Sequence, residues 1–209
     1  MELVGQEVLL MKRITIPRKS TDDLKETKSY KVLNARRGQR LGKIFVNLLR
    51  QAGFKKGRVL DLGTRSAEFP IQLALAFPEA EVVGLDLPEP LLDTARLSAE
   101  KVGVSDRLYF KNGDAQSLPF YTNSFNVVVS LNMLHTVDDP VAMLDEIERV
   151  LSPTGILILS DIKRSWLGLI IPVLRTAYTM AEFKELLQRS KLRPGKLSES
   201  IFWLGFSTA

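Results

Sequence analysis

The stretch that decides the fold of this chain is Val59-Leu60-Asp61-Leu62-Gly63-Thr64-Arg65-Ser66-Ala67. It is typical of a buried strand followed by a glycine-containing turn and the start of a helix. A turn of this kind brings backbone N–H groups and a helix N-terminus to the carboxyl edge of a parallel sheet, where α/β proteins bind nucleotide-like ligands. The stretch therefore predicts a ligand site directly after this strand.

Strand and helix patterns alternate after this turn, which predicts βαβ units and a parallel sheet with helices on both faces. The predicted strands cover residues 58–62, 81–86, 108–111, 125–131 and 155–160. The predicted helices cover residues 39–52, 70–77, 90–102, 140–151 and 180–190. Two final strand patterns, over 191–198 and 201–207, have a short connection that predicts an antiparallel hairpin at the sheet edge.

Two of these helices carry more detailed predictions. In the helix that follows Pro90, apolar spacing predicts that one buried face holds Leu91, Ala95, Ser98 and Val102. The helix before residue 190 begins with Thr179-Met180-Ala181-Glu182, which predicts a capping box. In such a box the Thr hydroxyl and the Glu carboxylate satisfy the exposed amides of the first turn.

Composition predicts a single globular domain in a reducing, cytoplasmic setting. A chain of 209 residues with 45% hydrophobic content can bury one substantial core. It contains no cysteine, which excludes a disulfide framework, a thiolate metal site and a cysteine nucleophile. The longest apolar run, over 166–174, is about half of the roughly 20 residues that a spanning helix needs. No signal peptide and no metal site are expected.

Charge is concentrated at the start of the chain. Residues 1–58 carry 15 Lys and Arg against five Asp and Glu. Such a basic region suggests an anionic partner, such as nucleic acid, an anionic membrane surface or a phosphorylated substrate. The alternative, a solvated helical face, is favoured. We expect a basic, mobile N-terminal extension over 1–32 and one folded domain over 33–209.

Six further motifs follow the first stretch in a fixed order. They are Val83-Gly84-Leu85-Asp86, Gly113-Asp114-Ala115, Leu118-Pro119-Phe120, Phe125-Asn126-Val127-Val128-Val129-Ser130, Leu134-His135 and Leu151-Ser152-Pro153-Thr154-Gly155-Ile156-Leu157. From about residue 33 onward the chain resembles the class I S-adenosylmethionine-dependent methyltransferases, especially the small-molecule group related to quinone and sterol methyltransferases. The resemblance implies a three-layer Rossmann-like α/β fold, with a mostly parallel seven-stranded sheet and an antiparallel C-terminal hairpin.

The resemblance also implies a site for S-adenosylmethionine. Asp86 would accept hydrogen bonds from the ribose hydroxyls, and Asp114 would accept one from the adenine amino group, beside the Ala115 N–H. Gly63 would let the turn approach the methionine half of the cofactor, and Asp61 would order that turn and help its amino group. The full set of implied cofactor residues is Asp61, Gly63, Thr64, Arg65, Asp86, Leu87, Asp114, Ala115, Ser130 and Asn132.

The turn departs from the family pattern Asp-x-Gly-x-Gly-x-Gly at its later two glycines, which are Arg65 and Ala67 here. Glycine at the Arg65 position permits a positive φ and a close approach of the cofactor. Three interpretations stay open. The Arg side chain swings outward and binding survives, its guanidinium pairs with the cofactor carboxylate, or it fills the pocket and binding is lost.

Methyl transfer requires that the acceptor be aligned for in-line attack on the methyl group. It requires a base only when the acceptor is a hydroxyl or similar nucleophile. His135, the sole histidine, follows the fourth strand near the expected methyl position and is the first candidate. Its alternative is a structural histidine. Asp161, just past the fifth strand, is the second candidate. Its alternative is a cap or a partner for Lys163 or Arg164.

The sequence thus predicts a methyltransferase that acts on a small acceptor. The apolar segment over 166–178 indicates an apolar or amphiphilic acceptor, a homodimer contact, or a helix packed on the core. The alternative motivated by Arg65 is a methyltransferase-like fold kept as a binding or regulatory module. An RNA methyltransferase is less favoured, since the Asn/Asp-Pro-Pro-Tyr/Phe tetrapeptide of amino-group enzymes is absent. Nicotinamide-dependent hydride transfer is disfavoured, because its fingerprint wants three glycines where Gly63, Arg65 and Glu68 stand.

Overall fold

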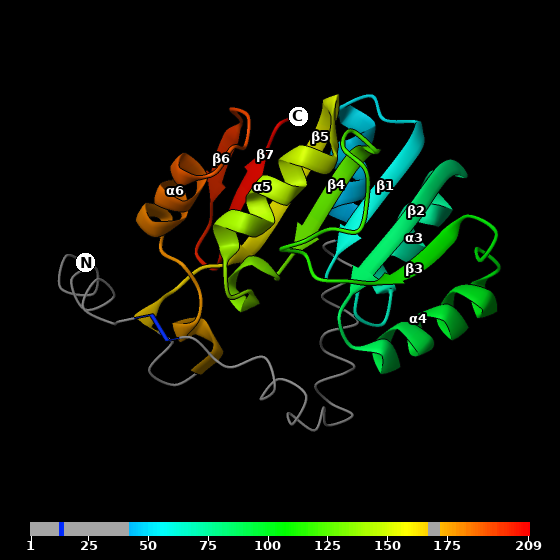
Figure 1. Ribbon diagram of the computed structural model, residues 1–209, viewed down its shortest axis with the longest axis horizontal. Coiled ribbons are helices and arrows are strands. Elements are labelled where there is room, and N and C mark those ends of the chain that lie inside the picture. The colour runs from blue at the N-terminus through cyan, green and yellow to red at the C-terminus, as the bar shows by residue number, and fades with distance from the viewer. Residues whose placement is uncertain (1–12, 15–41, 167–171) are drawn as a thin grey trace.

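The computed structural model of this chain describes residues 13–14, 42–166 and 172–209. Its centre is a seven-stranded sheet in the order β3-β2-β1-β4-β5-β7-β6 (Figure 1). Strands β1 to β5 pair in parallel, and β7 runs antiparallel to both β5 and β6. The strands are β1 (Lys56–Leu62), β2 (Glu79–Asp86), β3 (Leu108–Asn112), β4 (Phe125–Leu131), β5 (Leu151–Ile162), β6 (Lys196–Glu199) and β7 (Trp203–Ser207). The predicted fold class and C-terminal hairpin are confirmed.

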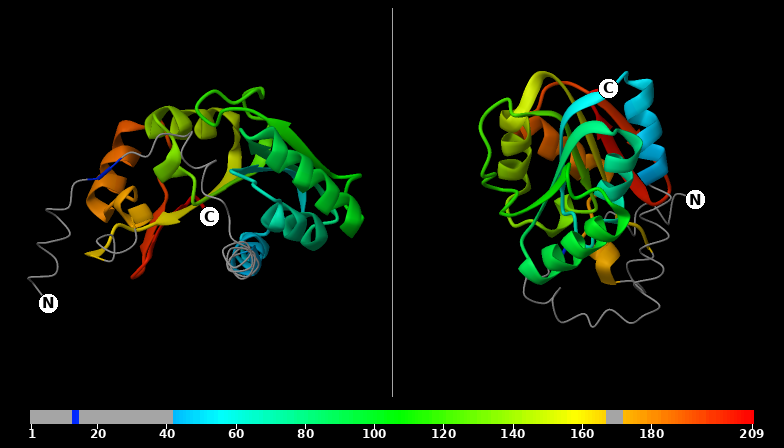
Figure 2. Two further views of the ribbon diagram at one scale, coloured as in Figure 1. Left: turned by 90° about the horizontal axis from the view of Figure 1, so that it is seen from below. Right: turned by 90° about the vertical axis from the view of Figure 1, so that its right-hand side faces the viewer.

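Helices cover both faces of this sheet. They are a helical segment over 42–51, α3 (Glu68–Ala76), α4 (Glu89–Val102), α5 (Pro140–Val150) and α6 (Met180–Arg189), with short 3-10 turns η2 (Leu134–Thr136) and η4 (Pro172–Arg175). One buried cluster includes α5 and α6, and a second includes the 42–51 helix, α3 and α4. Figure 2 (right) shows α5 and the 42–51 helix on opposite sides of the sheet. No helix in the described ranges has the length and apolarity to cross a membrane.

The continuous apolar runs of the central strands follow from this three-layer arrangement. In β1, Val59 belongs to one buried cluster, while Leu60 and Leu62 belong to the other. In β4, Val127 and Val129 pack on the same side as Val59. Successive strand residues point to opposite faces, so a strand covered by helices on both sides needs apolar residues at nearly every position.

The prediction for the buried face of α4 was right at Ala95 and wrong at Leu91, Ser98 and Val102. The buried residues are Leu92, Ala95 and Ala99, while Val102 is 45% exposed. Leu91 and Leu92 are both apolar, so spacing alone left the register ambiguous. Contact with the sheet decides it, because the small Ala95 and Ala99 let the helix backbone approach closely.

The predicted bounds of two strands were also wrong. β5 is longer than 155–160, because Leu151 pairs with Phe125 of β4 and Asp161 pairs with Leu204 of β7. β6 starts at Lys196 and not at residue 191. The reason is that preceding backbone N–H groups donate to carboxylates of α5 and not to a neighbouring strand; these bonds run from Lys191 to Asp145 and from Arg193 to Glu148.

The capping box predicted for α6 is confirmed. The Glu182 N–H donates to Thr179 Oγ1, and the Thr179 N–H donates to Glu182 Oε2 at 2.8 Å. Most of the predicted extension over 1–32 and the start of the helix predicted over 39–52 lie outside the described residues. The middle of the apolar segment over 166–178 lies outside them as well.

Candidate functional site

The loops that carry the predicted site residues meet at one edge of the sheet. Leu62, near the end of β1, is the register partner of Leu85 in β2 and of Ser130 in β4. Leu131 at the end of β4 pairs with Ser160 near the end of β5. The strand order reverses between β1 and β4, and such a switch point opens a crevice for ligands in α/β sheets. The carboxyl ends of these strands lie along the lower side of the sheet in Figure 1.

The turn after β1 is fixed to the neighbouring strand by backbone hydrogen bonds. The N–H groups of Gly63 and Thr64 both donate to the Leu85 carbonyl, at 2.9 and 3.2 Å. Gly63 has a φ of 79°, and a Cβ added there would lie 3.2 Å from Met133 Sδ. Glycine is therefore favoured here, both by the left-handed backbone and by the close approach of the Met133 side chain after β4.

Arg65 and Ala67 keep the left-handed backbone of the glycines that the family pattern has at their positions. Their φ angles are 48° and 69°. The Arg65 side chain is exposed and has no ion-pair partner among the described residues. This geometry agrees with the interpretation in which the side chain points outward. Because the Arg65 side chain faces solvent, it does not fill the pocket beside the turn.

Asp86 faces this turn from the end of β2. One carboxylate oxygen accepts the Arg65 N–H and the other accepts the Leu87 N–H, each at 2.8 Å. A carboxylate oxygen has two lone pairs, so each can accept a further hydrogen bond from a ligand hydroxyl. The arrangement thus suits a vicinal diol such as a ribose. It also means that Asp86 braces the turn that contains Arg65.

Beyond β3, Asp114 is oriented by a residue that the sequence analysis missed. The Gln116 N–H and its side-chain Nε2 donate to Asp114 Oδ1 at 2.9 and 3.0 Å. Gln116 Oε1 in turn accepts the N–H of Asp139, the N-cap residue of α5. Ala115 between them is fully buried. Nothing in the local pattern indicates Gln116, because its partner Asp139 is distant in sequence.

Hydrogen bonds to side chains of α5 hold the loop that follows Gln116. Glu146 accepts the Leu118 N–H at 2.7 Å, and Arg149 donates to the carbonyls of Leu118 and Phe120. Glu146 and Arg149 also form an ion pair at 2.6 Å. The hydrogen bonds from Arg149 hold the pKa of Glu146 below its usual value, so the carboxylate stays ionised and keeps these bonds.

Two buried polar atoms at the site have no hydrogen-bond partner among the described residues. They are Ser130 Oγ in β4 and Asn132 Oδ1 just after β4. Asn132 has a φ of 55°, and its backbone N–H is bound to the Ser160 carbonyl. Buried polar atoms almost always have a partner, so these two atoms at the end of β4 indicate a position for a polar ligand group. The residues present therefore fit the methionine end of the expected cofactor.

Asp61 is the buried carboxyl group beneath this position. It is 3% exposed, and its pKa is raised to about 7, mainly by burial and to a smaller extent by the carboxylates of Asp86 and Glu68, while a hydrogen bond from Thr64 opposes the shift. The group is thus poised to ionise near neutral pH. A cationic group such as the amino group of a ligand would favour the ionised form.

The two catalytic candidates contact each other. His135 Nδ1 lies 2.5 Å from Asp161 Oδ1, and the His135 backbone N–H donates to Asp161 Oδ2 at 2.9 Å. Both are buried, with exposed fractions of 8% and 1%. Lys163 and Arg164 pair with other carboxylates, those of Glu199 and Glu182. The alternative in which Asp161 serves either of these cations is therefore wrong.

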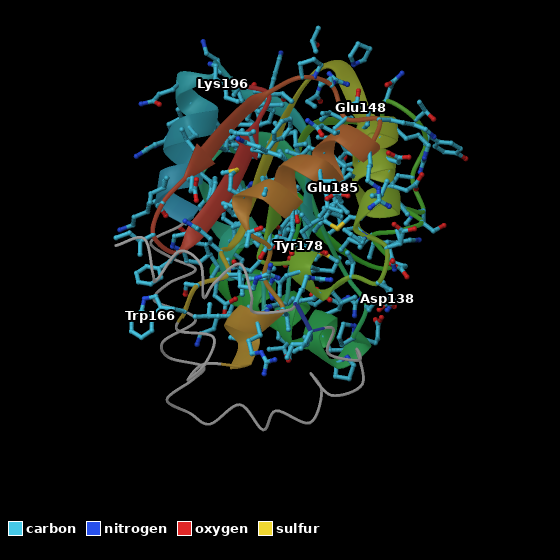
Figure 3. All side chains as sticks on the ribbon, turned by 90° about the vertical axis from the view of Figure 1, so that its left-hand side faces the viewer. Asp138, Glu148, Trp166, Tyr178, Glu185 and Lys196 are labelled. Atoms are coloured by element: carbon cyan, nitrogen blue, oxygen red, sulfur yellow. The ribbon has the colours of Figure 1, made fainter. Side chains whose placement is uncertain are left out.

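Tyr178 lies near the His135–Asp161 pair, and the sequence analysis did not identify it as a site residue. It is 5% exposed, and its hydroxyl is another buried atom for which residues 13–14, 42–166 and 172–209 supply no hydrogen-bond partner. Burial raises its pKa, and the carboxylate of Asp161 acts in the same direction while the Arg13 guanidinium opposes it. The phenol therefore stays protonated and can donate a hydrogen bond. Figure 3 labels Tyr178 below α6 on this side of the molecule.

Comparisons with known proteins identify the family to which this chain is similar. Residues 54–195 match the family model described as a methyltransferase domain. Demethylmenaquinone methyltransferase of Staphylococcus aureus is 30% identical over 163 residues, which cover 74% of this chain and 65% of that protein. The 27-O-demethylrifamycin SV methyltransferase of Amycolatopsis mediterranei is 36% identical over 104 residues, which cover 50% of this chain and 38% of that protein. The chain thus spans less than two thirds of either relative.

A solved structure shows the same fold. The SAM-dependent methyltransferase from Aquifex aeolicus superimposes with a TM-score of 0.66 at 22% identity, covering 77% of this chain and 86% of that one. The family match spans most of the chain and includes β1 through β5, with the loops that hold Asp61, Asp86 and Asp114. The chain therefore belongs to the class I S-adenosylmethionine-dependent methyltransferase family.

Proposed function

We propose that this chain methylates a hydroxyl group of a small-molecule acceptor with S-adenosylmethionine, and that His135 is the base. The observation that carries the proposal is the buried contact between His135 and Asp161, at the ends of the two strands next to the unpartnered polar atoms. Asp161 lies at the end of β5, and η2 brings His135 to it from the end of β4.

The cofactor would be held by side chains already in place. Asp86 would bind the ribose, Asp114 with Ala115 the adenine, and Asp61 with the polar atoms near Ser130 the amino-acid end. When bound, S-adenosylmethionine supplies a methyl group activated by its sulfonium. The chain's own task is then to align the acceptor oxygen and to remove its proton.

The His135–Asp161 pair suits this proton transfer. The carboxylate at Nδ1 requires the proton on that nitrogen, which leaves the Nε2 lone pair as the acceptor for a hydroxyl proton. Once His135 is protonated, Asp161 stabilises the imidazolium. The side chain of His135 is 7% exposed, so little water competes for Nε2.

An apolar or amphiphilic acceptor is supported by the surface near the end of β5. Trp166, Ile201 and Phe202 are 48%, 75% and 47% exposed. The Lys163 N–H donates to the Phe202 carbonyl, which brings the hairpin end beside the segment that carries Trp166. Figure 3 labels Trp166 on this side. Both relatives named above have small-molecule substrates in their names, and one name specifies an oxygen.

Calorimetry with S-adenosylhomocysteine tests cofactor binding. The wild-type chain should bind it, and Asp86→Ala should bind about tenfold to a hundredfold more weakly, since a charged acceptor contributes about 1.5–3 kcal/mol per hydrogen bond. Asp93→Ala, on the exposed surface of α4, is the matched control and should match the wild type. Absence of binding heat in the wild type would contradict the proposal.

The base is tested by transfer of a radiolabelled methyl group to a panel of hydroxylated quinones and polyketides. His135→Gln and Asp161→Asn should each lower the transfer rate by about a hundredfold or more, with S-adenosylhomocysteine affinity unchanged. A His135→Gln variant that transfers at the wild-type rate would show that the histidine is structural.

The alternative of a binding or regulatory module rests on Arg65 and Ala67. Because the Arg65 side chain is exposed, Arg65→Gly should change the S-adenosylhomocysteine dissociation constant by less than about threefold. A wild-type chain that binds nothing, together with an Arg65→Gly variant that binds, would favour the module. Ala67→Gly is the matched substitution at the second non-glycine position of the turn.

A further inference from the structure

Arg13, which is far from the active-site residues in sequence, contacts the residues around the His135–Asp161 pair. Its Nε donates to the Thr176 carbonyl at 2.8 Å, and its Nη2 donates to the His135 carbonyl at 3.2 Å. Its guanidinium carbon lies 4.1 Å from the centre of the Tyr178 ring. The next residue is also anchored, because the Ile14 N–H donates to the Arg175 carbonyl at 3.2 Å.

The shape of a guanidinium explains why arginine suits this position. Its planar edge presents several N–H donors in fixed directions, while its face stacks on an aromatic ring. Arg13 uses both at once, with two backbone carbonyls along the edge and Tyr178 at the face. A lysine ammonium is a point charge and cannot bridge the two carbonyls while it stacks. The position is half-buried, so water competes only in part for these bonds.

The contact at the His135 carbonyl has a consequence for the base. His135 sits in η2, a single 3-10 turn, which is a marginal element without outside support. Asp161 holds this residue at its backbone N–H and at Nδ1. Arg13 holds the same residue at its carbonyl oxygen, on the other side of the turn. The backbone of His135 is thus fixed at both of its polar groups by residues from distant parts of the chain.

We propose that Arg13 is a positioning residue for His135, through which the N-terminal part of the chain completes the active site. Arg13 keeps η2 seated so that the imidazole stays against Asp161 with Nε2 free. The inference rests on the proposed role of His135 as the base. It assigns to one arginine of the basic region an internal role in place of an anionic partner.

The sole histidine makes the test direct, because an untagged chain gives one imidazole signal set in a long-range ¹H–¹⁵N spectrum. The wild type should show a single Nδ1–H tautomer. Arg13→Ala should broaden this signal or add the Nε2–H tautomer, and Arg13→Lys should give a smaller change of the same kind. Arg189→Ala is the matched control, since Arg189 is exposed on α6, and it should leave the spectrum unchanged.

A wild-type imidazole spectrum in the folded Arg13 variants would overturn the inference. Should Arg13→Ala fail to fold, Arg13→Lys decides, because it keeps the charge and most of the side-chain volume. Affinity for S-adenosylhomocysteine should stay within about twofold in both variants, since Arg13 touches none of the cofactor residues. A wild type that does not bind S-adenosylhomocysteine would instead contradict the proposed function. Failure of the inference about Arg13 and failure of the proposed function therefore give different results.

Discussion

At the scale of single residues, Asp61 shows how burial and function combine. Its side chain is buried near the end of β1, and its register partner Gly84 in β2 leaves space for Thr64, because a Cβ at Gly84 would lie 2.5 Å from Thr64 Oγ1. Burial disfavours the charged form, so the carboxyl group holds its proton up to about pH 7. A buried carboxyl group whose pKa lies near neutral pH, and which lies beside a ligand position, can change its protonation state in response to the charge of the ligand.

We therefore expect the contribution of Asp61 to wild-type stability to fall between about pH 4 and about pH 7. The folded pKa of Asp61 is about 7 against 3.8 in the unfolded chain, so over this range the folded state binds more protons. The stabilisation that the protonated Asp61 contributes is fully present below its unfolded pKa and is lost as pH rises through its folded pKa. Asp61→Asn should remove this loss of stability, which is on the order of a few kcal/mol above about pH 7.

Urea unfolding at about pH 5 and about pH 8 measures this effect. The stability of Asp61→Asn relative to the wild type should be clearly higher at the more alkaline value. Equal differences at both values would mean that Asp61 does not titrate in this range in the folded protein.

At the scale of elements, the N-terminus of α6 depends on one glutamate with several partners. Glu182 completes the capping box with Thr179 and accepts a hydrogen bond at 2.6 Å from Arg164, which is 4% exposed. Although burial raises it, the hydrogen bonds from Thr179 and Arg164 together hold the pKa of Glu182 below its usual value. The carboxylate thus links the cap of α6 to the chain just after β5.

Glu182→Ala should destabilise the fold by about 2–4 kcal/mol, because it removes the cap and leaves the buried Arg164 guanidinium without its carboxylate. Glu185→Ala on the same helix is the matched control. Glu185 is exposed and pairs with Arg189 only at 4.0 Å, so the expected loss is within about 0.5 kcal/mol. Figure 3 labels Glu185 on the outer side of α6. Chemical unfolding of the two variants compares them, and equal losses would contradict the linking role.

At the scale of the whole molecule, stability is distributed unevenly across the sheet. The central strands are covered by helices on both faces, and Val127, Val128 and Val129 of β4 are fully buried. β6 is an edge strand that pairs only with β7, and all four of its residues are exposed. Local opening costs least where few buried contacts and only one ladder hold a strand.

Native-state hydrogen exchange should therefore resolve a gradient across the sheet. Amides of Val127 and Val129 should exchange only through global unfolding, whereas those of Leu197 and Glu199 should exchange through local opening with a much smaller free energy. Equal protection factors in β4 and β6 would contradict this description. Adding S-adenosylhomocysteine should raise protection in the turn after β1 if the cofactor binds there.

The positions of Asp86 and Asp114 at the sheet edge could be predicted from the sequence, because Asp86 ends β2 and Asp114 comes two residues after the end of β3. The orientation of their carboxylates could not. Asp86 accepts the Arg65 N–H from the next loop, and Asp114 is held by Gln116 and through it by the N-terminus of α5. Such second partners come from other elements, and local pattern carries no signal for them.

At Arg65, too, the sequence indicated the backbone conformation but not the direction of the side chain. The family pattern indicated that this turn needs positive φ, and the chain keeps it at 48° with a non-glycine residue. The direction of the side chain depends on the space around the turn, which residue identity does not reveal. The α4 register failed for a related reason, since Leu91 and Leu92 are equally apolar and only contact with the sheet selects one.

The amino-acid sequence by itself determined the order of strands and helices along the chain, the capping box of α6 and the sheet edge at which a ligand site is expected, because periodicity and turn chemistry act over a few neighbouring residues. Only the tertiary structure decided that His135 meets Asp161, that the buried Tyr178 hydroxyl has no hydrogen-bond partner in the described part of the chain, and that Arg13 reaches the carbonyls of Thr176 and His135. Those contacts join residues far apart in the chain, and they form only when the sheet and its loops fix the distances between side chains.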